Sequence, residues 1–114
     1  MTVDLFAGIP VSDYAAALVW YERLLGAPPA FIPNDVEAVW EVAEHRFLYV
    51  ELLPEHAGHA RHTLFVEDFE TRIAQIAERG LEPANQETYE NGVRKTTYSD
   101  ADGNEIGLGG GPVE

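Results

Sequence analysis

Three histidines recur at intervals of three residues in the middle of the chain, at His56, His59 and His62. Histidine clusters are a common sequence sign of a zinc site, because a neutral imidazole nitrogen binds this ion. The chain has no cysteine, and no carboxylate stands at a ligand spacing from these histidines. The segment from Pro54 to Ala60 contains Pro and Gly and shows no hydrophobic periodicity. We therefore interpret the histidines as exposed side chains in and beside a linker.

Other residue patterns that could carry chemistry are incomplete. Asp100-Ala-Asp-Gly lacks the third acidic position and the closing Glu of a calcium loop, so it predicts a hairpin turn. Gly109-Gly-Gly has no Lys or helix after it and is no phosphate loop; it predicts a frayed tail. The two serines, Ser12 and Ser99, lie at a predicted helix start and beside a turn. No catalytic triad can be read from their spacing.

Length and composition favour one packed domain. The chain has 114 residues, of which 46% are hydrophobic and 11% aromatic, and its net charge is −13. This charge repels phosphate backbones, so we expect no nucleic-acid partner. Because the sequence has no run of 18 apolar residues, we expect no membrane span. Because it has no signal-peptide pattern and no cysteine, we expect a cytoplasmic location. The acidic excess favours solubility, and it would also attract cationic ligands.

A weak internal repeat divides the chain. The segment Ile9-Pro-Val-Ser-Asp-Tyr14 matches the segment Leu64-Phe-Val-Glu-Asp-Phe69, so that position 9 corresponds to position 64. The aspartate of each match is expected to cap a following helix, because its carboxylate accepts from free N–H groups of the first turn. Apolar residues then recur at spacings of three and four, which predicts one apolar stripe on each helix. Gly26 and Gly80 stand where left-handed C-terminal caps are expected.

Three apolar stretches separated by turn signals follow each predicted helix. They are Ala30–Ile32, Val36–Val42 and Phe47–Leu53, then Glu82–Glu87, Val93–Tyr98 and Glu105–Leu108. The sequence therefore predicts an α/β (α+β) domain of two βαβββ modules, about 1–54 and 61–109, joined by a linker at 54–60. Helices cover only one face of each sheet, so the other faces are expected to form a cleft for a small ligand.

Several motifs in this order resemble a known family. Val11-x-Asp13, Trp20-Tyr21-x-x-Leu24-Leu25-Gly26, Arg79-Gly80 and the Asp100-Ala-Asp-Gly-Asn104 turn resemble the corresponding motifs of vicinal oxygen chelate proteins. This superfamily includes glyoxalase I, bleomycin-resistance proteins and extradiol dioxygenases. The resemblance extends from about residue 3 to 109 and implies the paired βαβββ fold and a homodimer.

In metal-dependent members of that family, four strand positions supply the ligands of a divalent ion. The resemblance places these positions at Phe6, Glu51, Arg61 and Gly107, with His62 one residue away from the third. A slip of one residue turns a strand side chain to the opposite face. One carboxylate does not hold a catalytic metal ion, so we expect no metal and no other cofactor, unless a bulge turns His62 inward.

Strand alternation, combined with the resemblance, predicts the wall of the cleft. Phe47 and Tyr49 share a face with Glu51, and Lys95 and Thr97 face inward on a later strand, whereas Trp40 could face either way. The expected ligand-binding residues are Phe6, Trp40, Phe47, Tyr49, Glu51, Arg61, His62, Lys95, Thr97 and Gly107. An ion pair between Glu51 and Arg61 would either orient a ligand or serve as a structural salt bridge. The aromatic residues could equally belong to the core or to a dimer interface.

These residues favour a protein that binds a small aromatic, cationic molecule without a metal ion. Such a protein would sequester a drug or a metabolite, as in antibiotic resistance. A divergent lyase, isomerase or epimerase is the alternative, with Glu51 and either Lys95 or His62 transferring protons. A third possibility is an accessory domain without a ligand, whose cleft is filled by its own Phe6, Phe47 and Tyr49. Whether the chain is an enzyme stays open, with binding favoured.

Overall fold

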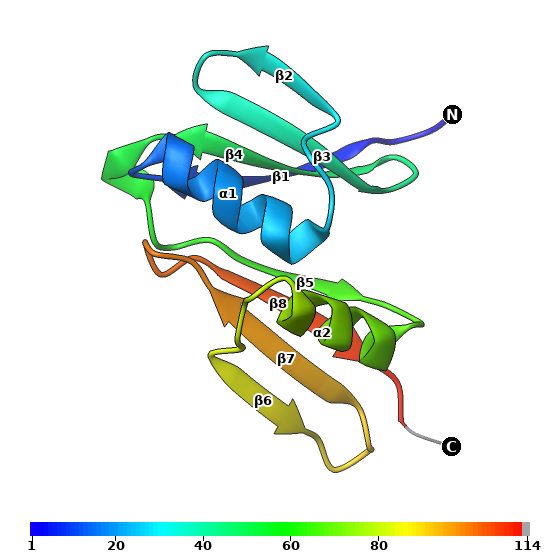
Figure 1. Cartoon of the computed structure of the whole chain (residues 1–114). Helices are drawn as coiled ribbons and strands as arrows, with labels where there is room; N and C mark the ends of the chain where they lie inside the picture. The colour runs from blue at the N-terminus through cyan, green and yellow to red at the C-terminus, as the bar shows by residue number, and fades with distance from the viewer. Residues whose placement is uncertain (113–114) are drawn as a thin grey trace.

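The computed structural model describes residues 1–112, and its first module is built around a four-stranded sheet (Figure 1). Its elements are β1 (Leu5–Val11), α1 (Tyr14–Leu25), β2 (Phe31–Asn34), β3 (Glu37–Ala43) and β4 (Arg46–Leu52). The strand order is β1-β4-β3-β2, with β1 and β4 parallel and the other pairs antiparallel.

The second module repeats this order. After a short 3-10 helix in the linker (Pro54–His56) come β5 (Arg61–Phe65), α2 (Phe69–Glu78), β6 (Asn85–Thr88), β7 (Arg94–Ser99) and β8 (Glu105–Gly110). Its sheet has the order β5-β8-β7-β6, again with the first pair parallel. The predicted α+β fold of two βαβββ units is confirmed. Among the described residues, neither helix has the length and apolar character needed to cross a membrane.

The two helices begin differently. The Asp13 carboxylate accepts from the Ala16 N–H at 3.0 Å, as the sequence predicts for an N-cap. The prediction was wrong for Asp68, which makes no capping bond, because its carboxylate accepts from the Arg72 guanidinium one turn later at 2.6 Å. Both predicted glycines, Gly26 and Gly80, adopt positive φ angles of 78° and 94°.

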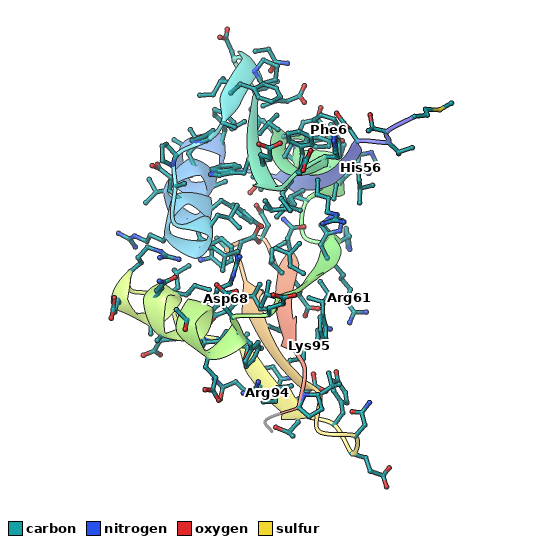
Figure 2. All side chains as sticks on the ribbon, turned by 90° about the vertical axis from the view of Figure 1, so that its right-hand side faces the viewer. Phe6, His56, Arg61, Asp68, Arg94 and Lys95 are labelled. Carbon is teal, nitrogen blue, oxygen red and sulfur yellow. The ribbon has the colours of Figure 1, made fainter. Side chains whose placement is uncertain are left out.

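Alternate strand residues face the helices and form the core. In the first sheet Ile9, Val11, Leu48 and Val50 are almost completely buried. In the second sheet Tyr98, Ile106 and Leu108 take the same role. Both helices lie on one side of the sheets, while the labelled Phe6, Arg61 and Lys95 lie toward the other side (Figure 2). Each sheet therefore keeps one face free of helices.

A buried amide joins the two modules. The Asn104 side chain is fully buried, accepts from the N–H groups of Gly58 and Ala60 at 3.1 and 3.0 Å, and donates to the Pro10 carbonyl at 2.7 Å. It also donates to the Asp100 carboxylate at 2.9 Å. The β7–β8 turn, predicted only as a hairpin turn, thus holds β1 of the other module and the linker together.

Two further side chains cross between the modules. The Tyr21 hydroxyl of α1 donates to the Asp100 carboxylate at 2.8 Å, and burial, together with this negative charge, raises the pKa of Tyr21, so the hydroxyl keeps its proton. The Arg79 guanidinium donates to the carbonyls of Arg23 and, at 3.1 Å, of Leu24. A cation at the C-terminal end of α1 is favourable because the free carbonyls there carry partial negative charge.

The glycine-rich tail corrects a prediction. The sequence predicted a frayed end from Gly109, yet β8 continues to Gly110 and both glycines are buried. The Phe65 ring lies over Gly109, and Phe69 of α2 packs directly on Gly110. The carbonyl of Gly111 accepts from the Arg94 guanidinium at 3.0 Å. The glycines are ordered because they leave room for aromatic side chains on both faces of the strand.

Candidate functional site

The helix-free face of the first sheet, here called the first open face, combines aromatic and acidic side chains. Cross-strand pairing sets Phe6 beside Phe47, Gly8 beside Tyr49, and Pro10 beside Glu51. The remaining members come from β2 and β3: Phe31, Glu37, Val39 and Glu41. Phe47, Tyr49 and Glu51 share one face, as alternation predicted.

The aromatic rings of the first open face contact one another but stay accessible. Phe6 and Phe47 stack with ring centroids 4.5 Å apart and planes 8° from parallel, and Phe31 meets Phe47 edge-on at 6.5 Å. Phe6 is still 47% exposed and Phe31 46% exposed. The Tyr49 ring lies over Gly8, where an added Cβ would come within 2.7 Å of its hydroxyl oxygen. The rings form an exposed apolar wall rather than a filled core.

Three carboxylates surround this wall without a counter-charge. Glu37 lies directly opposite Glu51, and Glu41 lies opposite Phe47. Like charges opposite each other on neighbouring strands repel. Within residues 1–112 none of the three is in an ion pair with Lys, Arg or His. The first open face is therefore electronegative as well as aromatic.

The helix-free face of the second sheet, here called the second open face, is more polar. It contains Arg61, Thr63, Phe65, Lys95, Thr97, Ser99, Glu105, Gly107 and Gly109. Lys95 and Thr97 are on this face, as alternation predicted. The expected ion pair between Glu51 and Arg61 does not form: Arg61 instead donates to Glu105, its direct cross-strand neighbour on β8, at 3.0 Å.

Trp40 belongs to the core and not to either open face. Its side chain is 2% exposed, and its indole Nε1–H donates to the Ala27 carbonyl at 2.8 Å. Trp40 pairs with the buried Leu48, so both side chains face α1. The expectation that Trp40 lines the ligand site is corrected, because the alternate positions Glu37 and Glu41 occupy the opposite face.

His62 also points away from the open faces. The pairing of β5 with β8 runs without a register shift, so no bulge turns His62 to the face that Arg61 occupies. Its Nε2 atom lies 2.9 Å from the Gly8 carbonyl oxygen of β1. His62 thus bridges the two modules. The predictions that it lies beside a ligand and that it transfers protons with Glu51 were wrong.

The four positions that the resemblance assigns to metal ligands do not fit a divalent ion. They hold the Phe6 ring, the Glu51 carboxylate, the Arg61 guanidinium and Gly107, over which the Lys95 stem lies. One carboxylate together with a phenyl ring, a guanidinium and a glycine is not a ligand set for such an ion. Among the described residues, no three His, Cys, Asp or Glu side chains come together in a metal-binding arrangement.

Several open-face residues escaped the sequence prediction. Phe31, Glu37, Glu41 and Thr63 were not among the expected site residues. The glutamates at Glu37 and Glu41 gave a usable signal for the helix-free side of β3, whereas the position of Phe31 depends on a register shift between β2 and β3.

Two surface hollows lie outside the first open face, and only one of them reaches the second, at its outer edge, where Asn85 pairs with Thr97. One is lined by residues 82–86 beside β6, and the other by residues 67–71 and Arg94 at the start of α2. The open faces themselves are exposed sheet surfaces. A ligand there would contact one face of a sheet unless a second copy covered it.

Comparison with known proteins agrees with this architecture. A family model described as Glyoxalase/Bleomycin resistance protein/Dioxygenase superfamily matches residues 3–108. No curated protein matches the chain. A solved structure of a glyoxalase/bleomycin resistance protein from Catenulispora acidiphila is 55% identical, with a TM-score of 0.94 and coverage of 97% of this chain and 100% of that one.

More distant structures share the fold. A bleomycin-binding protein complexed with bleomycin is 20% identical, with a TM-score of 0.76 and coverage of 99% and 100%. TnmS3, an antibiotic binding protein from Streptomyces sp. CB03234, is 24% identical, with a TM-score of 0.71 and coverage of 97% of each chain.

Proposed function

Because the chain belongs to the glyoxalase/bleomycin resistance protein/dioxygenase superfamily, we propose that it binds a small, planar, cationic organic molecule, without a metal ion, on the first open face. Drug or metabolite sequestration is the role that suits such a binder. Bleomycin-binding and antibiotic-binding proteins of the same fold support this choice.

The observation that carries this proposal is the uncompensated charge beside exposed aromatic rings. Phe6 and Phe31 are each almost half exposed, and Glu37 and Glu51 face each other with no cation between them. A planar cation could stack on the Phe6–Phe47 wall and relieve the repulsion of these carboxylates. A neutral or anionic ligand would leave the charge of these carboxylates uncompensated.

Replacing Phe47 with alanine is expected to weaken binding of a planar cation. Proflavine is a suitable probe because its fluorescence reports binding directly. The Phe47 ring contacts both Phe6 and Phe31, so its loss removes the centre of the wall and should lower proflavine affinity by about tenfold. The matched control is Tyr89→Ala, another exposed aromatic residue, in the β6–β7 hairpin. Equal affinity of the Phe47 and Tyr89 variants would contradict the assignment.

Glu51→Gln tests the carboxylate separately from the rings. The amide keeps the shape of the side chain and removes its charge. We expect proflavine affinity to fall roughly three- to fivefold at low salt, because an exposed charge contact is worth a fraction of a kcal/mol to about 1 kcal/mol. Affinity for acridone, a neutral planar probe, should stay unchanged. If both probes bound the variant as they bind the parent, Glu51 would have no role in binding.

The alternative of a divergent lyase or isomerase lacks a proton-transfer pair in this arrangement. His62 contacts Gly8 behind the sheet, and Lys95 lies on the other sheet from Glu51. We therefore place binding ahead of catalysis.

The resemblance implies a homodimer, and we further propose that two copies pair through their open faces. Exposed apolar side chains on both open faces, namely Phe6, Phe31 and Phe65, support this pairing. Sedimentation velocity should then give the mass of a dimer of the 12.6 kDa chain. Phe65→Glu, which places a charge on the second open face, should shift the population toward monomer. A monomeric parent protein at high micromolar concentration would contradict the pairing.

A further inference from the structure

Lys95 has an unusual place on the second open face. It is the only lysine of the chain, and the other six basic residues are arginines. It lies on β7, half-buried, on the side of the sheet away from α2 (Figure 2). Its aliphatic stem lies over Gly107, where an added Cβ would come within 2.7 Å of Lys95 Cε and 3.2 Å of Thr63 Oγ1. The absence of a side chain at Gly107 therefore brings the end of Lys95 near the Thr63 hydroxyl.

The carboxylates beside Lys95 have other partners. Glu87 lies directly opposite Lys95 on β6, but its carboxylate accepts from the Asn85 amide at 3.1 Å. Glu105 on β8 accepts from Arg61 at 3.0 Å. Lys95 is in no ion pair within residues 1–112, although the chain carries a net charge of −13. Partial burial of an ammonium without a counter-charge is unfavourable.

The surroundings of Lys95 suit an anionic oxygen. An ammonium offers three N–H donors, and a threonine hydroxyl offers one more. Thr63 is exposed on β5 and Thr97 lies directly across from Gly107 on β7. Charge-assisted hydrogen bonds from such donors to a carboxylate or phosphate oxygen are roughly twice as strong as bonds between neutral groups.

We propose that Lys95, with the hydroxyls of Thr63 and Thr97, forms an oxyanion subsite that receives a carboxylate or phosphate group of a small organic ligand. The inference rests on the proposed function in one respect, since it names the group that the second open face contributes to binding. It uses residues of the other sheet, so the two claims can fail separately. Together they describe a ligand with a planar cationic part and an anionic part.

The single lysine makes a direct test available. Protein labelled with 13C at the lysine ε-carbon gives one side-chain NMR signal, which reports on Lys95 alone. Benzoate and inorganic phosphate are the anionic probes, benzamide is the neutral match of benzoate, and sodium chloride at equal ionic strength controls for screening. We expect benzoate or phosphate to shift the signal saturably, while benzamide and chloride do not. The stronger of the two anions identifies the preferred oxyanion.

Two variants connect that response to the proposed donors. Lys95→Met keeps the apolar stem over Gly107 and removes the charge, and should lower anion affinity, followed by calorimetry, at least about tenfold. Thr63→Val keeps the labelled lysine and should weaken the saturable shift several-fold. Unfolding temperatures close to that of the parent would show that both variants are folded. A linear response equal to that of chloride, or unchanged anion affinity in Lys95→Met, would overturn the inference.

Proflavine separates this claim from the proposed function. If proflavine binds the parent and binds the Phe47 and Glu51 variants more weakly, while the anions give no saturable shift, the oxyanion subsite is refuted and the proposed function stands. If the anions bind Lys95 and proflavine does not bind, the proposed function is refuted and the subsite stands.

Discussion

Replacing Asn104 with alanine is expected to lower the free energy of unfolding by about 3–4 kcal/mol. The side chain is fully buried and serves the N–H groups of Gly58 and Ala60 and the carbonyl of Pro10. Alanine would leave these backbone groups without partners at the junction of the two modules. Each unsatisfied buried group costs about 1–3 kcal/mol, and some of that cost would be recovered by water. Urea unfolding followed by tryptophan fluorescence measures the difference.

The matched control is Asn85→Ala. Asn85 lies exposed on the edge strand β6 and makes one side-chain hydrogen bond, to Glu87. We expect its loss to change stability by no more than about 0.5 kcal/mol. If the two variants lost similar stability, the junction role of Asn104 would be refuted.

Replacing Gly110 with alanine is expected to destabilise the protein by about 1–3 kcal/mol, although only one methyl group is added. Its Cβ would lie 2.5 Å from the Cβ and 2.6 Å from the Cγ of Phe69. These atoms lie at the root of the side chain, so rotation of the ring cannot remove the overlap. Either α2 or the end of β8 would have to move. Thermal unfolding followed by circular dichroism measures the loss.

Gly111→Ala provides the control at the next position. A Cβ there would meet no heavy atom within 4 Å, and Gly111 is not among the residues with positive φ. We expect its stability to stay within about 0.5 kcal/mol of the parent. Unchanged stability in Gly110→Ala would mean that the tail is loose in solution, as its glycine-rich sequence first indicated.

Local sequence patterns predicted most of the fold. The Val-x-Asp repeat placed both helix starts, and Gly26 and Gly80 placed both helix ends, because capping depends on a few neighbouring residues. The strand stretches agree with the structure to within a few residues. The cap at Asp68 failed because Arg72 competes for its carboxylate, a contact that the repeat does not reveal.

Long-range partners account for what the sequence did not predict. Asn104 was interpreted within its own turn, whereas its partner Pro10 lies at the other end of the chain. The glycine tail is ordered by aromatic rings from β5 and α2. Arg61 pairs with Glu105 because both strand register and distance favour the direct neighbour over a residue of the other sheet.

For the open faces, strand alternation predicted which side chains share a face once the orientation of one residue of the strand was known. It put Phe47 and Tyr49 with Glu51, and Lys95 with Thr97. It could also have placed Trp40, because Glu37 and Glu41 mark the exposed side of β3. A shift of register in β2 is not encoded in such alternation, so Phe31 could not be placed in this way.

Thermal unfolding of the protein treated with EDTA tests the central claim most directly. One series adds proflavine in the continued presence of EDTA, and another adds nickel, zinc, manganese or iron after EDTA has been removed. A ligand that binds only the folded state raises the unfolding temperature in a concentration-dependent way. Metal-independent binding of a planar cation predicts a rise with proflavine and none with the metal ions. A rise with one of the metal ions and none with proflavine would contradict it.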